Sequence, residues 1–373
     1  MIHLATPNLA GREMEYLREC VETNFVSSVG PFVDRFELEF AKFVGSPNAV
    51  AAANGTCAIH IALVLAGVGP GDEVFVSNFT FAASANPIRY QFATPVLVDS
   101  EWDTWNLDPT LVVEELARRD RAGIAQPKAI IAVHILGCPA RLEAIVEACE
   151  RYDICLIEDA AEALGATYTD GPYKGRQVGT IGKMGCFSFN GNKIITSGGG
   201  GMLVTADTGL AQRAKFLTTQ AKRHGYAYFH EEVGYNYRLT NVAAAMGLAQ
   251  LEQIGHFLER KAQIAAFYNQ QLNGNPRVTP PPSPAGVQPT YWLYSVLLEK
   301  GWADLLKKME DNQIQTRPLW TALHLMPPFK DCQVLGTGRV AEKLCESGLS
   351  LPCSTNITSD ELDQVASALS RFI

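Results

Sequence analysis

One stretch, residues 155–205, constrains the fold more than any other part of this 373-residue chain. It opens on a short apolar run that ends with two carboxylates, Glu158 and Asp159. Such a run is typical of a buried strand that carries an acid to the carboxyl edge of a sheet. Further on, Phe187-Ser188-Phe189 alternates like a second strand, and Lys193 follows shortly after it. The stretch therefore predicts a buried acid and a lone lysine at two strand ends.

An acid and a lysine placed in this way are what a pyridoxal phosphate enzyme requires. Lys193 would form the Schiff base, and Asp159 would keep the pyridine nitrogen protonated so that the ring can accept electrons. An arbitrary acid or lysine is more often a helix cap or a solvated side chain. Here Lys193 lies between Asn-Gly-Asn and an Ile-Ile pair, ahead of the glycine run Gly198–Gly201. These glycines would let the backbone pass close to a bulky group, although a loose turn is the simpler alternative.

Composition and charge exclude several classes of function. The chain is 47% hydrophobic and 19% charged, which is typical of a globular enzyme and, at this length, allows two domains. The net charge of −8 argues against binding to nucleic acid or a membrane surface. Nine cysteines without C-x-x-C pairs indicate a reducing compartment and predict neither disulfides nor a zinc site. No signal-peptide pattern is visible and the apolar segment 59–68 is too short to span a bilayer, so we expect a cytoplasmic protein.

Strand-like and helix-like segments alternate between residues 49 and 205. We expect strands at 49–53, 74–76, 94–98, 128–136, 154–157 and 187–189, with helices from about 57, at 111–119 and at 142–152. This order predicts an α/β fold, a mostly parallel sheet with helices on both faces and ligands at the carboxyl ends of its strands. His134, in one of these strands, reads as a satisfied core histidine. Neither a G-x-G-x-x-G nor a Walker motif is present, so dinucleotide and P-loop functions lack their fingerprint.

The remaining segments predict a second, smaller α/β domain. We expect helices at 12–26, 32–43, 207–217, 242–269, 302–312 and 360–372, and strands at 291–298 and 314–317. A proline-rich connector, residues 276–289, is the clearest break in composition. We therefore divide the chain into a large domain, residues 1–255, and a small C-terminal domain, residues 256–373.

Two segments near the predicted carboxyl edge suit the cofactor. Asn54-Gly55-Thr56 breaks a strand and a helix begins at about Cys57, so unpaired amides would create an anion site. We expect the amides of Thr56 and Cys57 to hold the cofactor phosphate, although Thr56 alone could be a helix cap. Beyond the strand at 74–76, an aromatic side chain is well placed to stack on a flat ring, while core packing is the ordinary role of a phenylalanine.

The motifs E-D-A-A-E-A-L-G and F-S-F-N-G-N-K-I-I-T, with the glycine run that follows, resemble the nucleotide-sugar aminotransferases of the DegT/DnrJ/EryC1/StrS family. The likeness extends from P-N-L-A-G-R-E near the start to L-P-C-S-T-N near the end. It is greatest for the branch that acts on UDP-4-keto-6-deoxy-N-acetylhexosamines in bacillosamine and legionaminic acid pathways. The resemblance implies a fold-type I pyridoxal phosphate aminotransferase that also passes through the pyridoxamine phosphate form.

The resemblance also implies roles for individual residues around the cofactor. Phe81, rather than Phe79, would stack on the ring, and Glu162 could reach the ring hydroxyl. The G-Y-N-Y-R segment would cross a homodimer interface, so that Asn236 and Arg238 contact the phosphate in the partner's site. The complete set of expected cofactor contacts is Thr56, Cys57, Phe81, Asp159, Glu162, Ser188, Asn190, Lys193, Asn236 and Arg238.

Three further segments are candidates for binding the sugar nucleotide. The loop at 27–30 could be a plain linker, but by resemblance it lies near the sugar, with Ser28, Val29 and Gly30 as candidates. By the same resemblance, R-P-L-W…H brings Arg317, Trp320 and His324 to the substrate side. Loop 218–234 could hold nucleotide phosphates or could be an ordinary solvated loop. Its basic and aromatic residues are Lys222, Arg223, His224, Tyr226, Tyr228 and His230, of which His230 is our candidate.

The resemblance thus implies a ping-pong transfer of the L-glutamate amine to C4 of a UDP-linked 4-keto-6-deoxy-2-acetamido sugar, for surface glycans. A GDP- or dTDP-linked 4-keto-6-deoxy sugar, as in perosamine formation, is the alternative substrate. Family relatives that dehydrate C3 replace the Schiff-base lysine by histidine, whereas this chain keeps Lys193. A non-catalytic cofactor-binding regulator is the alternative of another class, but no basic patch or additional DNA-binding segment supports it.

Overall fold

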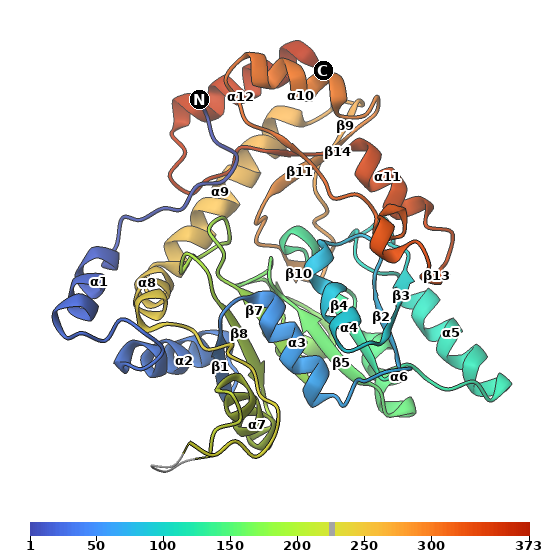
Figure 1. Ribbon diagram of the computed structural model, residues 1–373. Coiled ribbons are helices and arrows are strands. Elements are labelled where there is room, and N and C mark those ends of the chain that lie inside the picture. Colours follow the sequence, from blue (N-terminus) through green and yellow to red (C-terminus); the bar gives the residue numbers. More distant parts are fainter. Residues whose placement is uncertain (224–227) are drawn as a thin grey trace.

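The computed structural model describes residues 1–223 and 228–373 and is built around one eight-stranded sheet (Figure 1). In spatial order the strands are β1 (Asn48–Ala52), β8 (Gly201–Thr205), β7 (Met184–Ser188), β5 (Cys155–Asp159), β4 (Ala129–Val133), β2 (Glu73–Ser77), β3 (Thr94–Val98) and β13 (Val334–Leu335). Strand β8 runs antiparallel to both neighbours, and the other pairs are parallel. The predicted α/β fold with a mostly parallel mixed sheet is confirmed.

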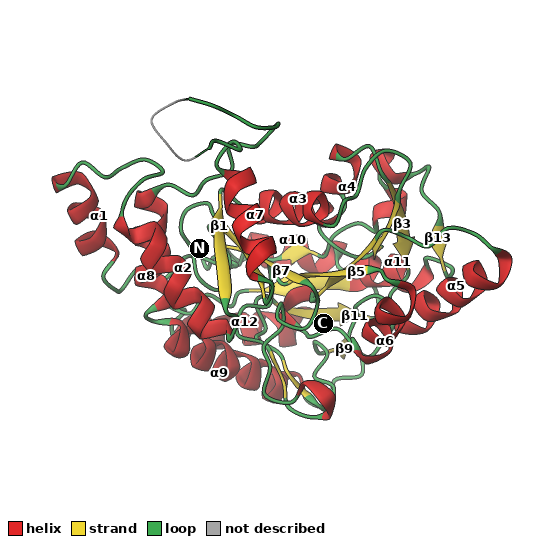
Figure 2. Cartoon of the chain, turned by 90° about the horizontal axis from the view of Figure 1, so that it is seen from below, coloured by secondary structure: helices red, strands yellow, loops and turns green. Residues whose placement is uncertain are grey.

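Helices cover both faces of this sheet, which explains the continuous apolar runs of its strands. All five residues of β4 are buried. Helix α3 (Gly55–Leu65) packs on β1, β7 and β8, with α4 (Asn86–Tyr90) and α7 (Thr208–Thr218) along the same face. Figure 2 shows α5 (Pro109–Ala122) and α6 (Glu143–Tyr152) on the other face, where α6 packs on β5. Both layers belong to one hydrophobic core.

The first N-terminal helix buries a different side from the one that its apolar residues predict. Helix α1 (Glu13–Glu22) is shorter than the predicted helix at 12–26, and its apolar row faces outward: Met14 is 71% and Val21 66% exposed. The buried side instead carries Tyr16 and Cys20. Tyr16 donates a hydrogen bond to the carboxylate of Glu252 (2.6 Å), which turns this side inward.

The predicted helix at 242–269 is two helices, α8 (Asn241–Leu251) and α9 (Ile254–Leu272). Helix α8 is buried between α1 and α2 (Pro31–Val44). Gln253 separates the two helices with a φ of −108° and a ψ of 4°, outside the helical region. Apolar spacing continues through this point, so the sequence pattern does not reveal the break.

A second, four-stranded sheet lies in the C-terminal part of the chain. Its antiparallel strands are β12 (Arg317–Pro318), β14 (Gly348–Leu351), β11 (Tyr294–Leu298) and β9 (Val278–Thr279). Helices α10 (Ala303–Asp311), α11 (Arg339–Ser347) and α12 (Ser359–Phe372) accompany it. The proline-rich stretch 276–289 supplies β9 and also β10 (Val287–Gln288), which pairs with β6 (Thr167–Tyr168) near the main sheet. Strand β14 and helix α11 were not predicted.

The two sheets are linked through both ends of the chain. Ile2 forms a bridge with Ile314, and the amide of Cys353 donates to the carbonyl of Leu4 (2.9 Å). Strand β13, far along the sequence, joins the edge of the main sheet beside β3. Figure 1 shows both termini at the end of the molecule that carries α10 and α12. The division at residue 255 stays a prediction. Within the described residues, no helix combines the length and the apolar character needed to cross a membrane.

Candidate active site

The carboxyl end of β5 delivers Asp159 into the interior. Its Oδ2 accepts a hydrogen bond from the hydroxyl of Ser84 (2.7 Å), and its Oδ1 accepts one from the amide of Ala161 (3.1 Å). Burial raises the pKa of Asp159 above its ordinary value, while the Ser84 bond and the charge of Lys193 act in the opposite direction. Ser84 was not foreseen, because it lies 75 positions earlier in the chain and reads as an ordinary loop residue.

Lys193 lies in the turn that follows β7. Its amide donates to the carbonyl of Asn190 (3.0 Å), and its Nζ lies 3.8 Å from Oε1 of Glu162 and 3.7 Å from the ring centroid of Trp292. The distance to Glu162 is longer than a hydrogen bond, so the amine is held loosely on that side. Burial lowers the pKa of Lys193, and the charges of Glu162 and Asp159 oppose that effect. An amine with a lowered pKa is easier to deprotonate and therefore a better nucleophile.

Glu162 faces Lys193 because a backbone amide fixes its other oxygen. Oε2 accepts from the amide of Leu136 (2.8 Å), in a turn where Leu136 has a φ of 54°, in the left-handed region. Burial raises the pKa of Glu162 to about 7, with the charge of Lys193 acting against it. Glu162 is therefore a carboxyl group that can change its charge near neutral pH.

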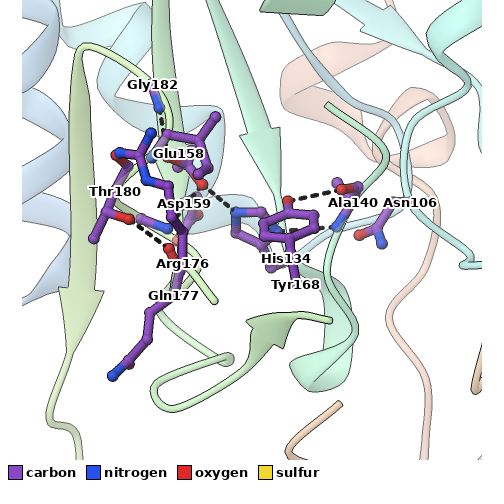
Figure 3. A network of polar contacts seen from close by, with 12 residues as sticks. Asn106, His134, Ala140, Glu158, Asp159, Tyr168, Arg176, Gln177, Thr180 and Gly182 are labelled. Atoms are coloured by element: carbon purple, nitrogen blue, oxygen red, sulfur yellow. Dashed lines mark hydrogen bonds and ion pairs between the residues drawn. The ribbon is translucent and has the colours of Figure 1, made fainter. Parts of the chain in front are cut away.

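Glu158 points to the side of β5 opposite Asp159 and belongs to a separate network (Figure 3). It accepts from His134 Nε2 (2.9 Å) and from three backbone amides of loop 179–182 (2.6–2.7 Å). The other ring nitrogen of His134 accepts from the amide of Ala140 (3.0 Å). Burial alone would raise the pKa of Glu158, but the His134 bond and the amides outweigh it and lower that pKa. The interpretation of His134 as a satisfied core histidine is confirmed.

The expected phosphate cradle lies at the start of α3. Asn54, not Thr56, caps this helix, because Asn54 Oδ1 accepts from the amide of Cys57 (2.8 Å). That bond engages one of the two amides assigned to the phosphate. Thr56 and Cys57 line a hollow of about 320 Å³ with His60, Tyr90 and Tyr237.

Glycines bring the start of α3 close to the main sheet. A Cβ on Gly55 would lie 2.9 Å from the Cβ of Ser188, the last residue of β7. A Cβ on Gly201 would lie 2.5 Å from the backbone of Asn54. Gly201, in the glycine run, therefore allows β8 to pass close to the backbone of Asn54. Ser188 lies beside the expected phosphate site at the start of α3.

Aromatic side chains line the region around Lys193. Phe81 is 56% exposed, whereas Phe79 is buried. The ring centroids of Phe81 and Trp320 lie 6.5 Å apart, and Trp320 stacks on Trp292 at 6.2 Å with an interplanar angle of 13°. Phe81 thus has the exposed face that stacking on a cofactor ring would need. Trp292 was missed because, in Y-W-L-Y, it reads as one more residue of a strand.

A second group of predicted residues gathers elsewhere. Ser28, Val29, Gly30 and Arg238 line a hollow of about 200 Å³. Asn236 is exposed and forms a bridge with Thr219.

The loop at Ser28–Gly30 is held by Asn241, which sequence reasoning did not single out. The side chain of this buried residue accepts from the amide of Phe32 (2.9 Å) and donates to the carbonyl of Phe25 (2.8 Å). An asparagine can do both because its amide group carries an acceptor and a donor. The loop therefore has a defined shape rather than that of a plain linker.

The remaining substrate candidates lie in two places. Arg317 is exposed on β12. The ring of His324 is engaged on both sides, by Asn78 (2.8 Å) and by Glu342 (3.0 Å). These contacts leave neither ring nitrogen of His324 free for a sugar, because each already has a partner.

The predicted loop 218–234 is described only at residues 218–223 and 228–234. His230 is exposed there, and its Nδ1 contacts the carbonyl of Gln220 (2.8 Å). His224 and Tyr226, which belong to the same predicted phosphate-binding loop, lie outside the described residues.

The chemistry of the predicted cofactor residues fits pyridoxal phosphate. Asp159 can accept a hydrogen bond from a protonated ring nitrogen, Phe81 offers a ring face, and Lys193 offers an amine. Thr56 and Ser188 would supply hydroxyl donors for the phosphate. The donor set matches the charge distribution of this cofactor: an acid for its nitrogen, an amine for its aldehyde and neutral donors for its phosphate.

Comparisons with known proteins identify relatives of the whole chain. The model of the DegT/DnrJ/EryC1/StrS aminotransferase family matches residues 7–370. EpsN of Bacillus subtilis, provisionally assigned as a pyridoxal phosphate-dependent aminotransferase, is 42% identical over 99% of this chain and 95% of its own. GDP-perosamine synthase of Caulobacter vibrioides is 40% identical over 100% and 98%. A solved DegT DnrJ EryC1 StrS aminotransferase from Brucella abortus superposes with a TM-score of 0.90, at 30% identity, over 97% and 95%. The expected nearness to the bacillosamine branch is not confirmed by these relatives.

Proposed function

The chain belongs to the DegT/DnrJ/EryC1/StrS aminotransferase family, and from this premise we propose that it moves the amine of L-glutamate to C4 of a nucleotide-linked 4-keto-6-deoxy sugar. Its class, a pyridoxal phosphate-dependent sugar aminotransferase, follows from the family. The observation that carries the proposal is the largely buried Lys193 amine beside Glu162, with the charge of Asp159 acting on it.

Each residue of the site has a distinct task in such a reaction. Pyridoxal phosphate, when bound, supplies an aldehyde that takes up the amine and a ring that accepts electrons. Lys193 would hold that aldehyde and would supply the amine that moves a proton to or from the substrate carbon. Asp159 keeps a proton on the ring nitrogen through a charge-assisted hydrogen bond of about 1.5–3 kcal/mol. Thr56 and Ser188 would anchor the phosphate, whereas the Cys57 amide is engaged by Asn54.

The substrate that the sequence motifs favour is a UDP-linked 2-acetamido sugar. A GDP-linked 4-keto-6-deoxy sugar is the second candidate, because the Caulobacter relative is a GDP-perosamine synthase. A panel of UDP-, GDP- and dTDP-linked 4-keto sugars, each incubated with L-glutamate and scored by product mass, would separate them. Efficient amination of the GDP-linked sugar alone would overturn the UDP assignment.

We further propose that the enzyme is a homodimer with shared active sites, in the cytoplasm. Apolar side chains at the N-terminal part of the chain are exposed rather than packed: Met14, Val21, Phe25, Val26 and Val29. A second copy covering this surface would remove it from water. Exposed Asn236 could then reach a partner's phosphate. Light scattering at several concentrations would test the dimer, and a monomer would contradict it.

The first test of the proposed function is Lys193→Ala. We expect this variant to lose all turnover and the covalently held cofactor, because no other amine occupies that position. Borohydride treatment followed by mass spectrometry would locate the cofactor on residue 193 in the parent protein. Lys183→Ala is the control, since Lys183 is an exposed lysine near the same sheet that pairs with Asp207. Sugar amination at the normal rate by Lys193→Ala would reject the assignment.

A further inference from the structure

We infer that Trp292 is a positioning residue for the Lys193 amine, an inference that rests on the proposed function. Trp292 contacts Lys193 in two ways. The ring centroid lies 3.7 Å from Nζ of Lys193, and the indole Nε1 donates to the carbonyl of Asn192 (2.6 Å). One side chain therefore holds both the amine and the backbone immediately before it.

Trp292 is itself held from two other directions. Its carbonyl accepts from Nζ of Lys261 (2.8 Å), a buried lysine on α9 that also donates to the carbonyl of Cys353 (2.6 Å). The indole stacks on Trp320 with nearly parallel planes. A buried side chain with its backbone, ring face and ring nitrogen all engaged has little freedom to move.

Two different groups lie within 3.8 Å of the amine. Glu162 presents a carboxylate oxygen that can gain or lose a proton. Trp292 presents an electron-rich ring face, which attracts a cation but exchanges no proton. Trp292 thus restricts where the amine can lie and favours its charged form, while Glu162 adjusts that charge with pH. A correctly placed amine would bond an aldehyde faster than one that samples several orientations.

Two variants, Trp292→Phe and Trp292→Leu, separate these contacts in the full-length apoprotein. Phenylalanine keeps a ring face but loses the bond to Asn192, and leucine loses both. Affinity for pyridoxine 5′-phosphate, which has no aldehyde, would report cofactor docking without Lys193 chemistry. The rate of covalent capture of pyridoxal phosphate, trapped by borohydride between pH 6 and pH 9, would report the amine.

We expect pyridoxine phosphate affinity to stay within about twofold of the parent, whereas covalent capture slows about tenfold in Trp292→Leu and less in Trp292→Phe. The pH midpoint of capture should fall in Trp292→Leu, because the charged amine loses the ring face. Trp302→Phe is the control, since Trp302 is a partly buried tryptophan whose Nε1 donates to Cys345 in the small sheet region.

Capture in Trp292→Leu at the parental rate and pH midpoint would overturn the inference while leaving the proposed function intact. If Trp292→Leu does not fold, Trp292→Phe decides: slower capture with Trp302→Phe unaffected supports the inference, and unchanged capture rejects it. If the parent protein captures no cofactor on Lys193, the proposed function itself fails.

Discussion

Glu158 and Asp159 are consecutive buried residues at the end of β5, yet their surroundings differ completely. Glu158 accepts four hydrogen bonds, from His134 and from loop 179–182. Asp159 accepts one from Ser84 and one from Ala161. The pKa of Glu158 is lowered and that of Asp159 is raised. Because successive side chains of a strand point to opposite faces, one peptide bond separates a structural acid from a catalytic candidate.

This difference teaches how a functional carboxylate can be identified. A buried carboxylate whose two oxygens accept enough hydrogen bonds stabilises the fold. A buried carboxylate that accepts few hydrogen bonds lowers stability, so its presence indicates a role in binding a ligand that is not part of the chain. The two neighbours should therefore respond oppositely to neutralisation.

The largest effect is expected for Asp159→Asn. Turnover should fall about 10²- to 10⁴-fold, because the asparagine no longer holds a proton on the ring nitrogen. The cofactor should still bind through Lys193 and the phosphate contacts. Steady-state kinetics and the absorbance of bound cofactor would be measured together. Unchanged kinetics would show that Asp159 is not needed for catalysis, so that it would not differ from Glu158 in function.

Glu158→Gln should act on stability instead. We expect a loss of about 3 kcal/mol in the free energy of unfolding, because an amide cannot accept from all the donors that converge on Glu158. Urea denaturation monitored by circular dichroism would measure it. Glu150→Gln, on the exposed side of α6, is the matched control and should change stability by less than about 0.5 kcal/mol. Equal stability of the two variants would contradict the structural role of Glu158.

Glu158 and Asp159 should change the stability of the folded protein in opposite directions as the pH rises. The raised pKa of Asp159 means that the folded apoprotein holds its proton more tightly than the unfolded chain, so Asp159 lowers stability as the pH rises above 3.8. The lowered pKa of Glu158 means that its contribution is complete above 4.5 and is lost as the pH falls. Apo Asp159→Asn should accordingly be at least as stable as the parent at pH 7. Urea titrations from pH 3.5 to pH 7 would check this, and a less stable Asp159→Asn would refute it.

The smallest effect is expected for Glu162→Gln. With a pKa of about 7, Glu162 becomes anionic near neutral pH and then favours the charged form of Lys193. Glutamine removes that influence, so covalent capture of cofactor should shift to lower pH by a few tenths of a unit to one unit, on the order of a severalfold rate change at pH 7. If the plot of capture rate against pH still shows an inflection near pH 7 in the variant, another group must cause that inflection.

Much of the main sheet could be predicted because most residues of its strands are buried and apolar. The break between α8 and α9 could not, since the apolar spacing continues through Gln253. The exposure of the apolar side of α1 could not be predicted either. Met14 and Val21 keep helical spacing, but the hydrogen bond of Tyr16 to Glu252 holds the other side against the core. Apolar periodicity predicts that a helix forms more reliably than it predicts which element the helix packs against.

The site was predictable where chemistry and strand ends coincide, as for Lys193 and Asp159. It was not predictable where a contact depends on distant segments meeting. Ser84 reaches Asp159 across 75 positions, and Trp292 reaches Asn192 across 100. Asn54 was passed over for Thr56 as the helix cap, although both residue types can fill that position.

The attachment of β13 to the main sheet restricts how this protein can admit a large substrate. The C-terminal part is attached to the rest of the chain at several places, among them β13 beside β3, β10 beside β6 and Ile2 beside Ile314. A wide swing of that part as a rigid flap would separate β13 from β3 and β10 from β6. We therefore expect a large substrate to enter by local displacement of surface loops, and the opening that these loops allow would set the size of the molecules that can reach Lys193.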